Sequence, residues 1–326
     1  MEALLIPWVL LLLVLIVAVC LIRKWWKVGA TIAIVLLLAN WHWNVFSLGF
    51  NSLDKLKDSD CLRVMTWNIS CADTTEIKDV NSLFAVIREQ NPDVVFITEY
   101  GRDLYPMVDS LLCSSFPYRG SIENWRSWSD FYSRLPIDTC YMVETENNGC
   151  VMSHEVSFAG SRVRLYCVHL QSTNLVNNES FYPDSIQDRG SAMHYLDNYK
   201  TAAEIRGHQA KQTIDDFDDT PTIVMGDMND VCGSPCMKVF ESAGLRDAWW
   251  EGGFGYGATI HKPLAYRIDY VMYSEGFSRF AGSWFDRLTN RWFQKVSGGL
   301  KLKGIKKVSS KGLSDHDALV ADFEIE

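Results

Sequence analysis

Four apolar, strand-like runs in this chain end at or adjoin a short polar segment, and this repeated placement restricts the fold more than any other feature. The segments are Trp67-Asn68, Ile97-Thr98-Glu99, Gly226-Asp227-Met228-Asn229 and Ser314-Asp315-His316. Although the segments lie far apart in sequence, strands of one sheet can bring their ends to a common rim. The pattern therefore predicts a sheet that gathers acidic, amide and imidazole side chains along one edge.

Short strands and helices alternate from Leu62 onward, the middle of this region is mainly stranded, and one long helix precedes the last strands. The expected strands cover residues 62–67, 93–98, 130–133, 139–143, 151–158, 163–169, 222–225, 268–273 and 318–324, and the expected helices cover 80–90, 192–217 and a short stretch after Pro235. This mixed order indicates an α+β fold in which two packed sheets are flanked by helices. A hydrophobic content of 48% in 326 residues is sufficient for a core of that size.

The first 50 residues have a different character and are expected to form a membrane anchor. Ala3 to Ile22 is an uncharged apolar run, which as a helix is about 30 Å long, the thickness of a bilayer's hydrocarbon core. A second apolar run covers residues 28–48, so we expect two transmembrane helices, at about 3–22 and 28–48; one helix plus an interfacial segment is the alternative. A cleaved signal peptide fits less well, because the first run is long, begins with an acidic residue and lacks a small-residue cleavage site. The polar stretch 51–61 is expected to be a linker.

Basic residues predict the orientation of this anchor. Arg23, Lys24 and Lys27 lie in the short turn between the two apolar runs, and the positive-inside rule places that turn in the cytoplasm. We therefore expect a plasma membrane location, typical of a bacterial inner membrane, with the region after the linker outside the cytoplasm. The aromatic cluster at residues 41–43 suits the membrane–water interface.

Charge and cysteine content restrict the partners only in part. The net charge of -9 disfavours long-range attraction to nucleic acid or to an anionic membrane. Lysines between Lys295 and Lys311 form a local exception, which is either a flank that attracts phosphate groups or a solvated loop. Of the nine cysteines, Cys232 and Cys236 are candidates for a disulfide in an exported domain, whereas buried free thiols are the default.

Glu99 and Asn68 are the best candidates for holding a divalent cation. Mg²⁺ prefers oxygen ligands, and one or two carboxylates with substrate phosphate oxygens suffice to bind it. Glu99 ends the apolar run 94–98, where an unpaired carboxylate would be costly to bury. Taken alone, however, such a Glu is more often a side chain emerging into solvent, and such an Asn is more often a turn residue.

Asp227 and Asn229 follow another buried run, and Gly226 allows a sharp turn as that strand ends. Residues two apart in an extended chain point the same way, so this acid and amide can together hold a water molecule and a phosphate oxygen. The same alternation directs Asp230 away from them. An Asp-rich turn without a catalytic role is the competing interpretation.

Two histidines complete the set. His316 can donate to a phosphoryl oxygen, and Asp269 can orient its ring. His169 ends another predicted strand, where a single histidine is more often structural; beside the other strand-end groups it becomes a candidate for stabilising a transition state.

The order of these groups along the chain resembles the endonuclease/exonuclease/phosphatase superfamily. The sequence Asn, Glu, His, Asp-x-Asn, Asp and Asp-His carries the resemblance, together with the segment Ser133-Arg134-Leu135-Pro136-Ile137, and it covers about residues 62–326. The resemblance implies a four-layer α/β/β/α sandwich and a catalytic domain over 62–326 that hydrolyses phosphodiester bonds with a divalent metal. One departure is Gly257-Ala258-Thr259-Ile260, where many members have a threonine–aromatic pair.

The resemblance also implies roles for individual residues. Asn68 and Glu99 would bind Mg²⁺ or Mn²⁺, with Asp315 either as a further ligand or as an acid that contacts the ligands.

The remaining groups would act on the substrate. Asp227 would align or deprotonate the attacking water, and Asn229 would steady the phosphate. His316, oriented by Asp269, and His169, which would also contact the substrate, would stabilise charge on phosphorus.

The expected substrate is a phosphodiester, with nucleic acid favoured. Phospholipid is possible because a tethered domain meets lipid at high effective concentration, and phosphatase activity on small phosphoesters is a further alternative. The expected partners are this substrate and the lipid bilayer; no protein partner is implied. A membrane-bound protein that binds a phosphate ligand without turnover is the alternative from another class.

Overall fold

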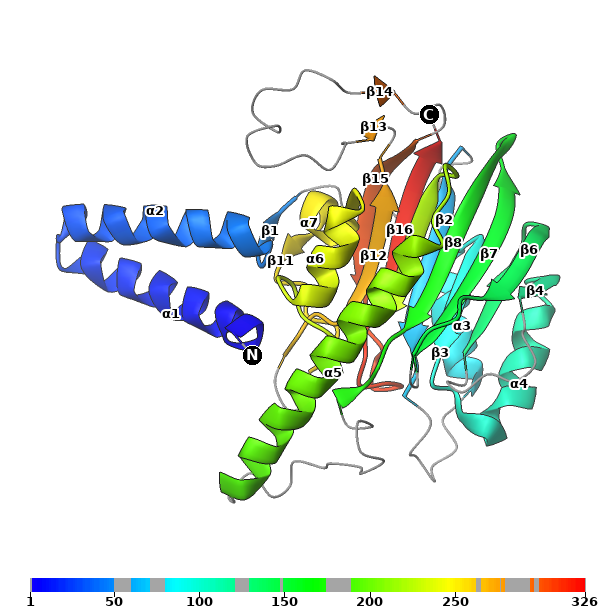
Figure 1. Ribbon diagram of the computed structural model, residues 1–326, viewed down its shortest axis with the longest axis horizontal. Helices are drawn as coiled ribbons and strands as arrows, with labels where there is room; N and C mark the ends of the chain where they lie inside the picture. The colour runs from blue at the N-terminus through cyan, green and yellow to red at the C-terminus, as the bar shows by residue number, and fades with distance from the viewer. Residues whose placement is uncertain are drawn as a thin grey trace.

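The computed structural model describes residues 2–49, 60–70, 80–120, 129–146, 149–173, 189–261, 265–275, 277–278, 294–295 and 299–325. Its centre consists of two six-stranded sheets (Figure 1). The strand order of the first is β15 (Leu300–Val308), β16 (Ala318–Ile325), β2 (Leu62–Asn68), β3 (Val94–Thr98), β5 (Asp130–Ser133) and β4 (Tyr118–Gly120). The order of the second is β10 (Leu245–Asp247), β12 (Asp269–Ser274), β9 (Thr222–Asp227), β8 (Ser161–His169), β7 (Cys150–Phe158) and β6 (Ile137–Met142).

The two sheets pack face to face, and the alternation of side chains along each strand explains the layers. In β2, Leu62 and Val64 belong to the cluster between the sheets, whereas Met65 and Trp67 belong to the cluster under the helices of the first sheet. Successive side chains of a strand point to opposite faces, so one buried strand supplies both layers. The predicted arrangement of two packed sheets with flanking helices is therefore confirmed.

Helices cover the outer faces of both sheets. The first sheet packs against α3 (Val80–Gln90) and α4 (Gly101–Cys113). The second packs against α5 (Arg189–Asp215) and α6 (Pro235–Ser242), which lie along it in Figure 1. A short helix, α7 (Ala248–Gly252), follows β10, and the small pair β13 (Phe277–Ser278) and β14 (Gln294–Lys295) completes the elements of this region.

The strand registers bring the functional strand ends together. β2 and β3 are parallel, with Asn68 opposite Thr98, and β8 and β9 are parallel, with His169 opposite Asp227. β12 runs antiparallel to β9 and places its first residue, Asp269, opposite Asp227. Parallel neighbours end at the same edge of a sheet, so the polar strand ends share one rim.

The N-terminal residues form a hairpin of two helices, α1 (Glu2–Ile22) and α2 (Trp26–Trp43), that extends from the side of the sandwich (Figure 1). In the described part of the chain, only Ala3–Ile22 is long and apolar enough to cross a membrane, with a mean hydropathy of 3.3. The prediction of two transmembrane helices is therefore wrong for the second one. Its helix ends at Trp43 rather than at residue 48, and Lys27, Asn40 and His42 lower its hydropathy.

The chain after α2 joins the sandwich directly. β1 (Ser47–Leu48) pairs with β11 (Phe254–Gly255), so residues assigned to the end of the second membrane helix instead form a strand of a small sheet. Most of the predicted linker, residues 51–61, lies outside the described residues.

The cysteines that the structure describes are free thiols, and Cys232 and Cys236, the disulfide candidates, are both buried. Their burial agrees with the default expectation of buried thiols.

Candidate active site

Five predicted residues meet at the rim where strands of both sheets end. Asn68 ends β2, Glu99 follows β3, His169 ends β8, Asp227 ends β9 and Asp269 begins β12. All but Glu99 are buried, with 7% exposure at most, and Glu99 is partly exposed. The sequence pattern of polar strand ends thus corresponds to one cluster in space.

Local backbone geometry turns the chain at these strand ends. Gly226 has φ +140°, and a Cβ atom built there would lie 1.9 Å from the carbonyl oxygen of Val168. Only glycine therefore permits β9 to approach β8 at this point. Glu99 and Asn229 adopt left-handed φ values of 57° and 52°, which direct both residues out of their strands.

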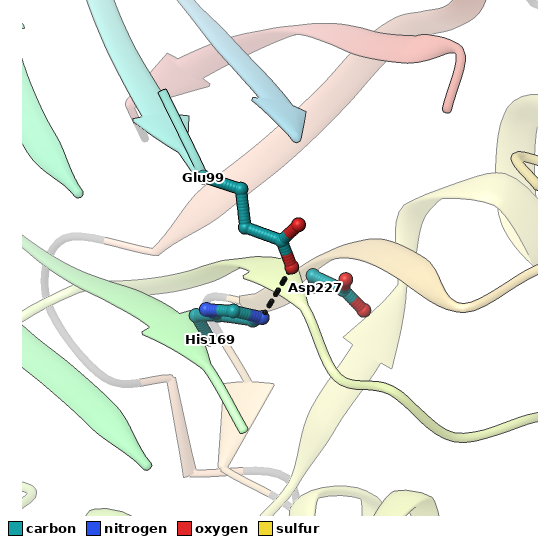
Figure 2. A group of neighbouring side chains, drawn as sticks. All are labelled: Glu99, His169 and Asp227. Atoms are coloured by element: carbon teal, nitrogen blue, oxygen red, sulfur yellow. Dashed lines mark ion pairs between the residues drawn. The ribbon is translucent and has the colours of Figure 1, made fainter. Parts of the chain in front are cut away.

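Glu99, His169 and Asp227 form the first polar group (Figure 2). Their potential ligand atoms all lie within 4.8 Å of one another, and His169 Nε2 lies 3.1 Å from Glu99 Oε1. Burial alone would raise the pKa of Glu99, but contact with His169 and the charge of His316 lower it to about 2. Burial likewise opposes protonation of His169, and Glu99 nevertheless raises its pKa. Each side chain therefore favours the charged form of the other.

This group fits a divalent cation. Both ring nitrogens of His169 are buried, and neither has a well-aligned hydrogen bond to any residue that the structure describes, although Nε2 is close to Glu99. Unsatisfied buried donors and acceptors are uncommon. Carboxylates and a neutral imidazole are both ligands of divalent ions, so this donor set can hold a cation once His169 has released its proton.

Asn68 and Asn229 bracket the carboxylate of Asp227. Asn68 Nδ2 donates to Asp227 Oδ2 at 3.0 Å, and the backbone N–H of Asn229 donates to Asp227 Oδ1 at 2.7 Å. The oxygen of the Asn68 amide accepts from Ser70 N–H at 2.9 Å. Burial, together with the nearby charge of Asp269, raises the pKa of Asp227 to about 6 despite the opposing charges of His316 and His169. Asp227 is therefore a fixed carboxylate that can exchange a proton near neutral pH.

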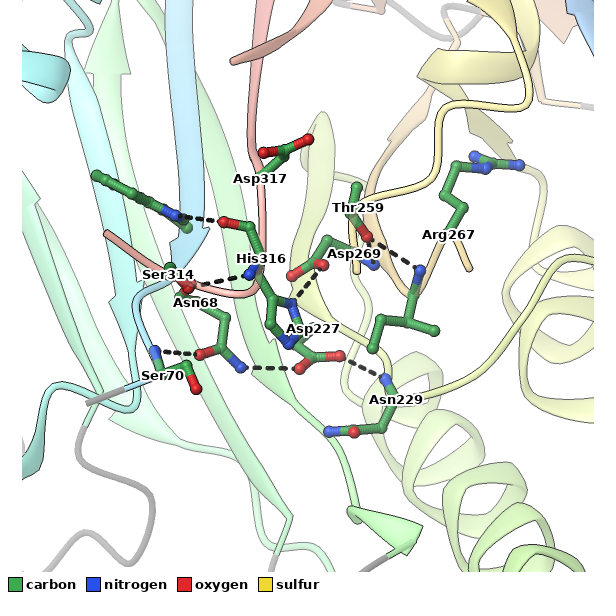
Figure 3. A network of polar contacts seen from close by, with 12 residues as sticks. Asn68, Ser70, Asp227, Asn229, Thr259, Arg267, Asp269, Ser314, His316 and Asp317 are labelled. Carbon is green, nitrogen blue, oxygen red and sulfur yellow. Dashed lines mark hydrogen bonds and ion pairs between the residues drawn. The ribbon is translucent and has the colours of Figure 1, made fainter. Parts of the chain in front are cut away.

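Asp227, Asp269 and His316 form a second group that shares Asp227 with the first (Figure 3). His316 Nδ1 and Asp269 Oδ2 are 2.8 Å apart. Burial alone would lower the pKa of His316, but the charge and hydrogen bond of Asp269 raise it to about 10. His316 is consequently an imidazolium at neutral pH.

Short hydrogen bonds fix the backbone around His316. Ser314 Oγ donates to the carbonyl of Asn68 at 2.8 Å and accepts from His316 N–H at 3.0 Å, and Trp67 Nε1 donates to the carbonyl of His316 at 3.1 Å. The end of β2 and the segment before β16 are therefore locked together, as Figure 3 shows.

Two residues not predicted to act in the site support it. Thr259 Oγ1 accepts from the backbone N–H groups of Ile268 and Asp269 at 3.2 and 3.1 Å, and so fixes the start of β12. Arg206, fully buried in α5, pairs with Asp230 at 3.0 Å. Sequence signals covered two of these residues: Thr259 lies in the segment 257–260, and Asp230 follows β9 at a position that was expected to point away from Asp227. A single arginine within a long helix gives no such signal.

Other predicted features lie at the margins of the cluster. Asp315 is exposed and belongs to neither polar group, so its role as a ligand stays a prediction. Asn229 is partly exposed and donates through Nδ2 to the carbonyl of Leu170 at 3.0 Å.

Of the lysine flank, Lys303 pairs with Glu324 at 3.1 Å and Lys307 with Asp317 at 2.9 Å. These lysines lie on β15, a strand rather than a loop.

Comparison with known proteins agrees with this geometry. A sequence profile of the Endonuclease/Exonuclease/phosphatase family matches residues 65–316. No curated protein sequence matches the chain.

Several solved structures share the fold. D. rerio TDP2, solved with a single-strand DNA product, has a TM-score of 0.54 at 17% identity, covering 82% of this chain and 99% of that one. The human Nocturnin catalytic domain has a TM-score of 0.53 at 17% identity, covering 82% and 94%. Sphingomyelinase C from Streptomyces griseocarneus has a TM-score of 0.50 at 17% identity, covering 80% and 99%.

Proposed function

The chain belongs to the endonuclease/exonuclease/phosphatase family, whose members are metal-dependent hydrolases of phosphoric esters, and we propose that it is a phosphodiesterase with Asp227 at its catalytic centre. The observation that carries this proposal is the position of Asp227 between two charged pairs, Glu99–His169 and Asp269–His316. A carboxylate with a raised pKa stands beside an imidazolium, which is a suitable arrangement for adding water to a phosphoryl group.

Each polar group then has a role in the reaction. Asp227 accepts the proton of the attacking water, because its raised pKa makes it a competent base near neutral pH. His316 donates a hydrogen bond to a phosphoryl oxygen, and Asp269 holds its ring in the charged form. Asn229 and His169 bind the phosphate group.

The proposed cofactor is Mg²⁺ or Mn²⁺. Glu99 and Asn68 would hold it, with His169 and Asp227 at the same rim and Asp315 as a further ligand. When bound, the cation would neutralise negative charge on the phosphate.

Hydrolysis of bis(p-nitrophenyl) phosphate by the full chain in detergent tests this function. We expect turnover with Mg²⁺ or Mn²⁺ and its loss with EDTA. Asp227→Asn should lower kcat by about 10²–10⁴-fold, the usual contribution of a general base. Asp138→Asn, an exposed change on β6, is the matched control and should leave turnover unchanged. Absence of turnover with every divalent ion would favour a phosphate-binding protein, and full activity in Asp227→Asn would refute the site assignment.

Nucleic acid is the first candidate substrate, and D. rerio TDP2, with its single-strand DNA product, is a precedent on this fold. Two observations weigh against it: the net charge of -9 and the pairing of Lys303 and Lys307 with acidic residues.

A phospholipid headgroup is the second candidate, and one structural feature favours it. Val231 lies next to Asp230, and Ile268 lies next to the site residue Asp269; both pack in one cluster with α1 and α2. The rim thus adjoins the apolar hairpin. Plasmid nicking, compared with phosphocholine release from sphingomyelin vesicles, separates the two substrates.

The proposed location is the plasma membrane, a bacterial inner membrane, with α1 as the anchor. Arg23, Lys24 and Lys27 lie around the turn at the far end of the hairpin from the sandwich (Figure 1). The positive-inside rule keeps this turn in the cytoplasm, so an extracytoplasmic catalytic domain requires α2 to return through the bilayer beside α1. Alkaline phosphatase fused to the carboxyl end should be active, and an inactive fusion would reverse this orientation.

A further inference from the structure

The apolar helix α1 meets the catalytic domain without a spacer. Its apolar run begins at Ala3, and Ala3, Ile6 and Leu10 are already buried in a cluster that contains Val231 and Cys232 of the domain. A bilayer that accommodates the whole of α1 must therefore reach the surface of the domain at this point.

The hairpin is also fixed in orientation. The hydroxyl group of Ser47, which is 1% exposed, lies 3.0 Å from the carbonyl oxygen of Trp250 and 2.6 Å from that of Gly253. Trp43 packs against Gly233 so closely that a Cβ atom there would lie 2.8 Å from the indole ring. These contacts join the end of α2 to the domain as one packed unit rather than through a flexible tether.

Exposed apolar side chains concentrate at this junction. Leu48 and Phe254 are paired across β1 and β11 and are 69% and 65% exposed, and Trp41 on the last turn of α2 is 72% exposed. Over the described residues 60–325, only Met107, Tyr118 and Phe254 are large apolar side chains with high exposure, and Phe254 is the most exposed of the three. Exposed apolar residues gathered in one place mark an interaction surface.

We propose that the β1–β11 ribbon is a second membrane contact, in which Leu48 and Phe254, together with Trp41, enter the headgroup layer of a lipid bilayer. Aromatic side chains favour this layer because they combine an apolar ring with contact to water. α1, which packs beside α2 in the same hairpin, also exposes apolar side chains, such as Leu12 and Leu15 at 56% and 57%. This proposal rests on the membrane anchoring proposed above. It implies that the catalytic rim is held at a fixed position relative to the bilayer.

Photo-cross-linking of the full chain in vesicles of phosphatidylcholine and phosphatidylglycerol tests the contact. p-Benzoylphenylalanine replaces Phe254 or Leu48 in separate variants, and Leu15 in a variant that reports on the anchor. Tyr118, an exposed aromatic residue on β4 away from the hairpin, is the matched control position. We expect positions 254 and 48 to capture lipid about tenfold more than position 118, as interfacial side chains should.

The outcomes distinguish the contact from the anchoring and from the chemistry. Capture at position 15 with only the control level at 254 and 48 would show that the domain stands away from the bilayer, and would overturn the proposal while the anchor stands. Control-level capture at position 15 as well would overturn both. Turnover of bis(p-nitrophenyl) phosphate by the same samples reports separately on the proposed function, because this substrate is soluble.

Discussion

His316 keeps its proton in the folded chain because carboxylates surround it. Asp269 lies 2.8 Å from its Nδ1 atom, and Asp227 and Asp315 add to the favourable charge. Burial alone would lower the pKa of His316, but these carboxylates raise it to about 10. The pKa of a histidine in an unfolded chain is about 6.5. The folded state therefore binds a proton that the unfolded chain releases between these two values.

This difference predicts a pH-dependent stability for the metal-free protein. The contribution of His316 is complete below the unfolded pKa and is lost progressively as the pH rises toward 10. In EDTA, the Tm measured by tryptophan fluorescence should fall between about pH 7 and pH 10, in the direction given by proton linkage. Asp269→Asn removes the principal partner and should flatten this slope, which separates His316 from lysines and tyrosines that titrate in the same range. Equal slopes of Tm against pH in the unchanged chain and in Asp269→Asn would contradict the assignment of this pH dependence to His316.

The residues of the rim were accessible to sequence reasoning because each follows a recognisable strand. The expected proximity of Asp269 to His316 is present in the structure, while the catalytic roles remain proposals. Thr259 and Ser314 act through hydrogen bonds to the backbone of distant segments. Such contacts depend on tertiary packing, and no local sequence pattern indicates them.

At the scale of elements, α5 connects the two loops that follow β8 and β9. Arg206 donates through Nε to Asp230 Oδ2 at 3.0 Å and through Nη1 to the carbonyl of Gln171 at 3.0 Å. The hydroxyl group of Tyr199, on the same helix, donates to Asp230 Oδ1 at 2.9 Å. The segments that follow His169 and Asp227 are thus held together around one fully buried ion pair.

Arg206→Met should destabilise the protein strongly, because it leaves the buried carboxylate of Asp230 without its cation. Removal of one partner of a buried pair costs about 3–5 kcal/mol, which denaturant unfolding of the full chain in detergent can measure. Lys211→Ala on the same helix removes an exposed pair with Asp215, and such pairs contribute about 0–1 kcal/mol. A similar loss of unfolding free energy in Arg206→Met and Lys211→Ala would show that the buried Arg206–Asp230 pair stabilises the protein no more than an exposed pair does.

Two elements, α4 and β15, were not predicted because their sequences combine features of different structures. α4 contains Gly101 and Pro106, which have low helix propensity, so its pattern did not indicate a helix. β15 alternates lysines with apolar residues at 301–303 and resembled a charged loop. It is an edge strand of the first sheet, where lysines discourage pairing with other chains. Edge strands are therefore harder to recognise than the buried strands that carry the site.

At the scale of the whole molecule, the hairpin and the sandwich form a single packed structure. The hydrophobic cluster at the junction combines α1 and α2 with residues Val231, Cys232, Tyr266 and Ile268. Trp8 and Tyr266 meet edge to face with ring centroids 6.4 Å apart. Tyr266 and Ile268 lie just before Asp269, so the hairpin supports the segment that positions His316.

Removal of residues 1–46 should therefore impair the catalytic domain itself. The shortened chain keeps β1 but exposes the apolar face that α1 and α2 cover, and large exposed apolar patches promote association. We expect a lower Tm, a tendency to aggregate and reduced turnover of bis(p-nitrophenyl) phosphate, even though this substrate needs no membrane.

A matched full-length variant separates packing from anchoring. Leu15→Ser alters a side chain of α1 that is 57% exposed and outside the junction cluster, so it should leave turnover in detergent unchanged. Equal Tm and turnover in the shortened and full chains would show instead that the hairpin is a passive tether. Reduced turnover in the shortened chain alone would show that the site depends on the hairpin through the contacts of Tyr266 and Ile268.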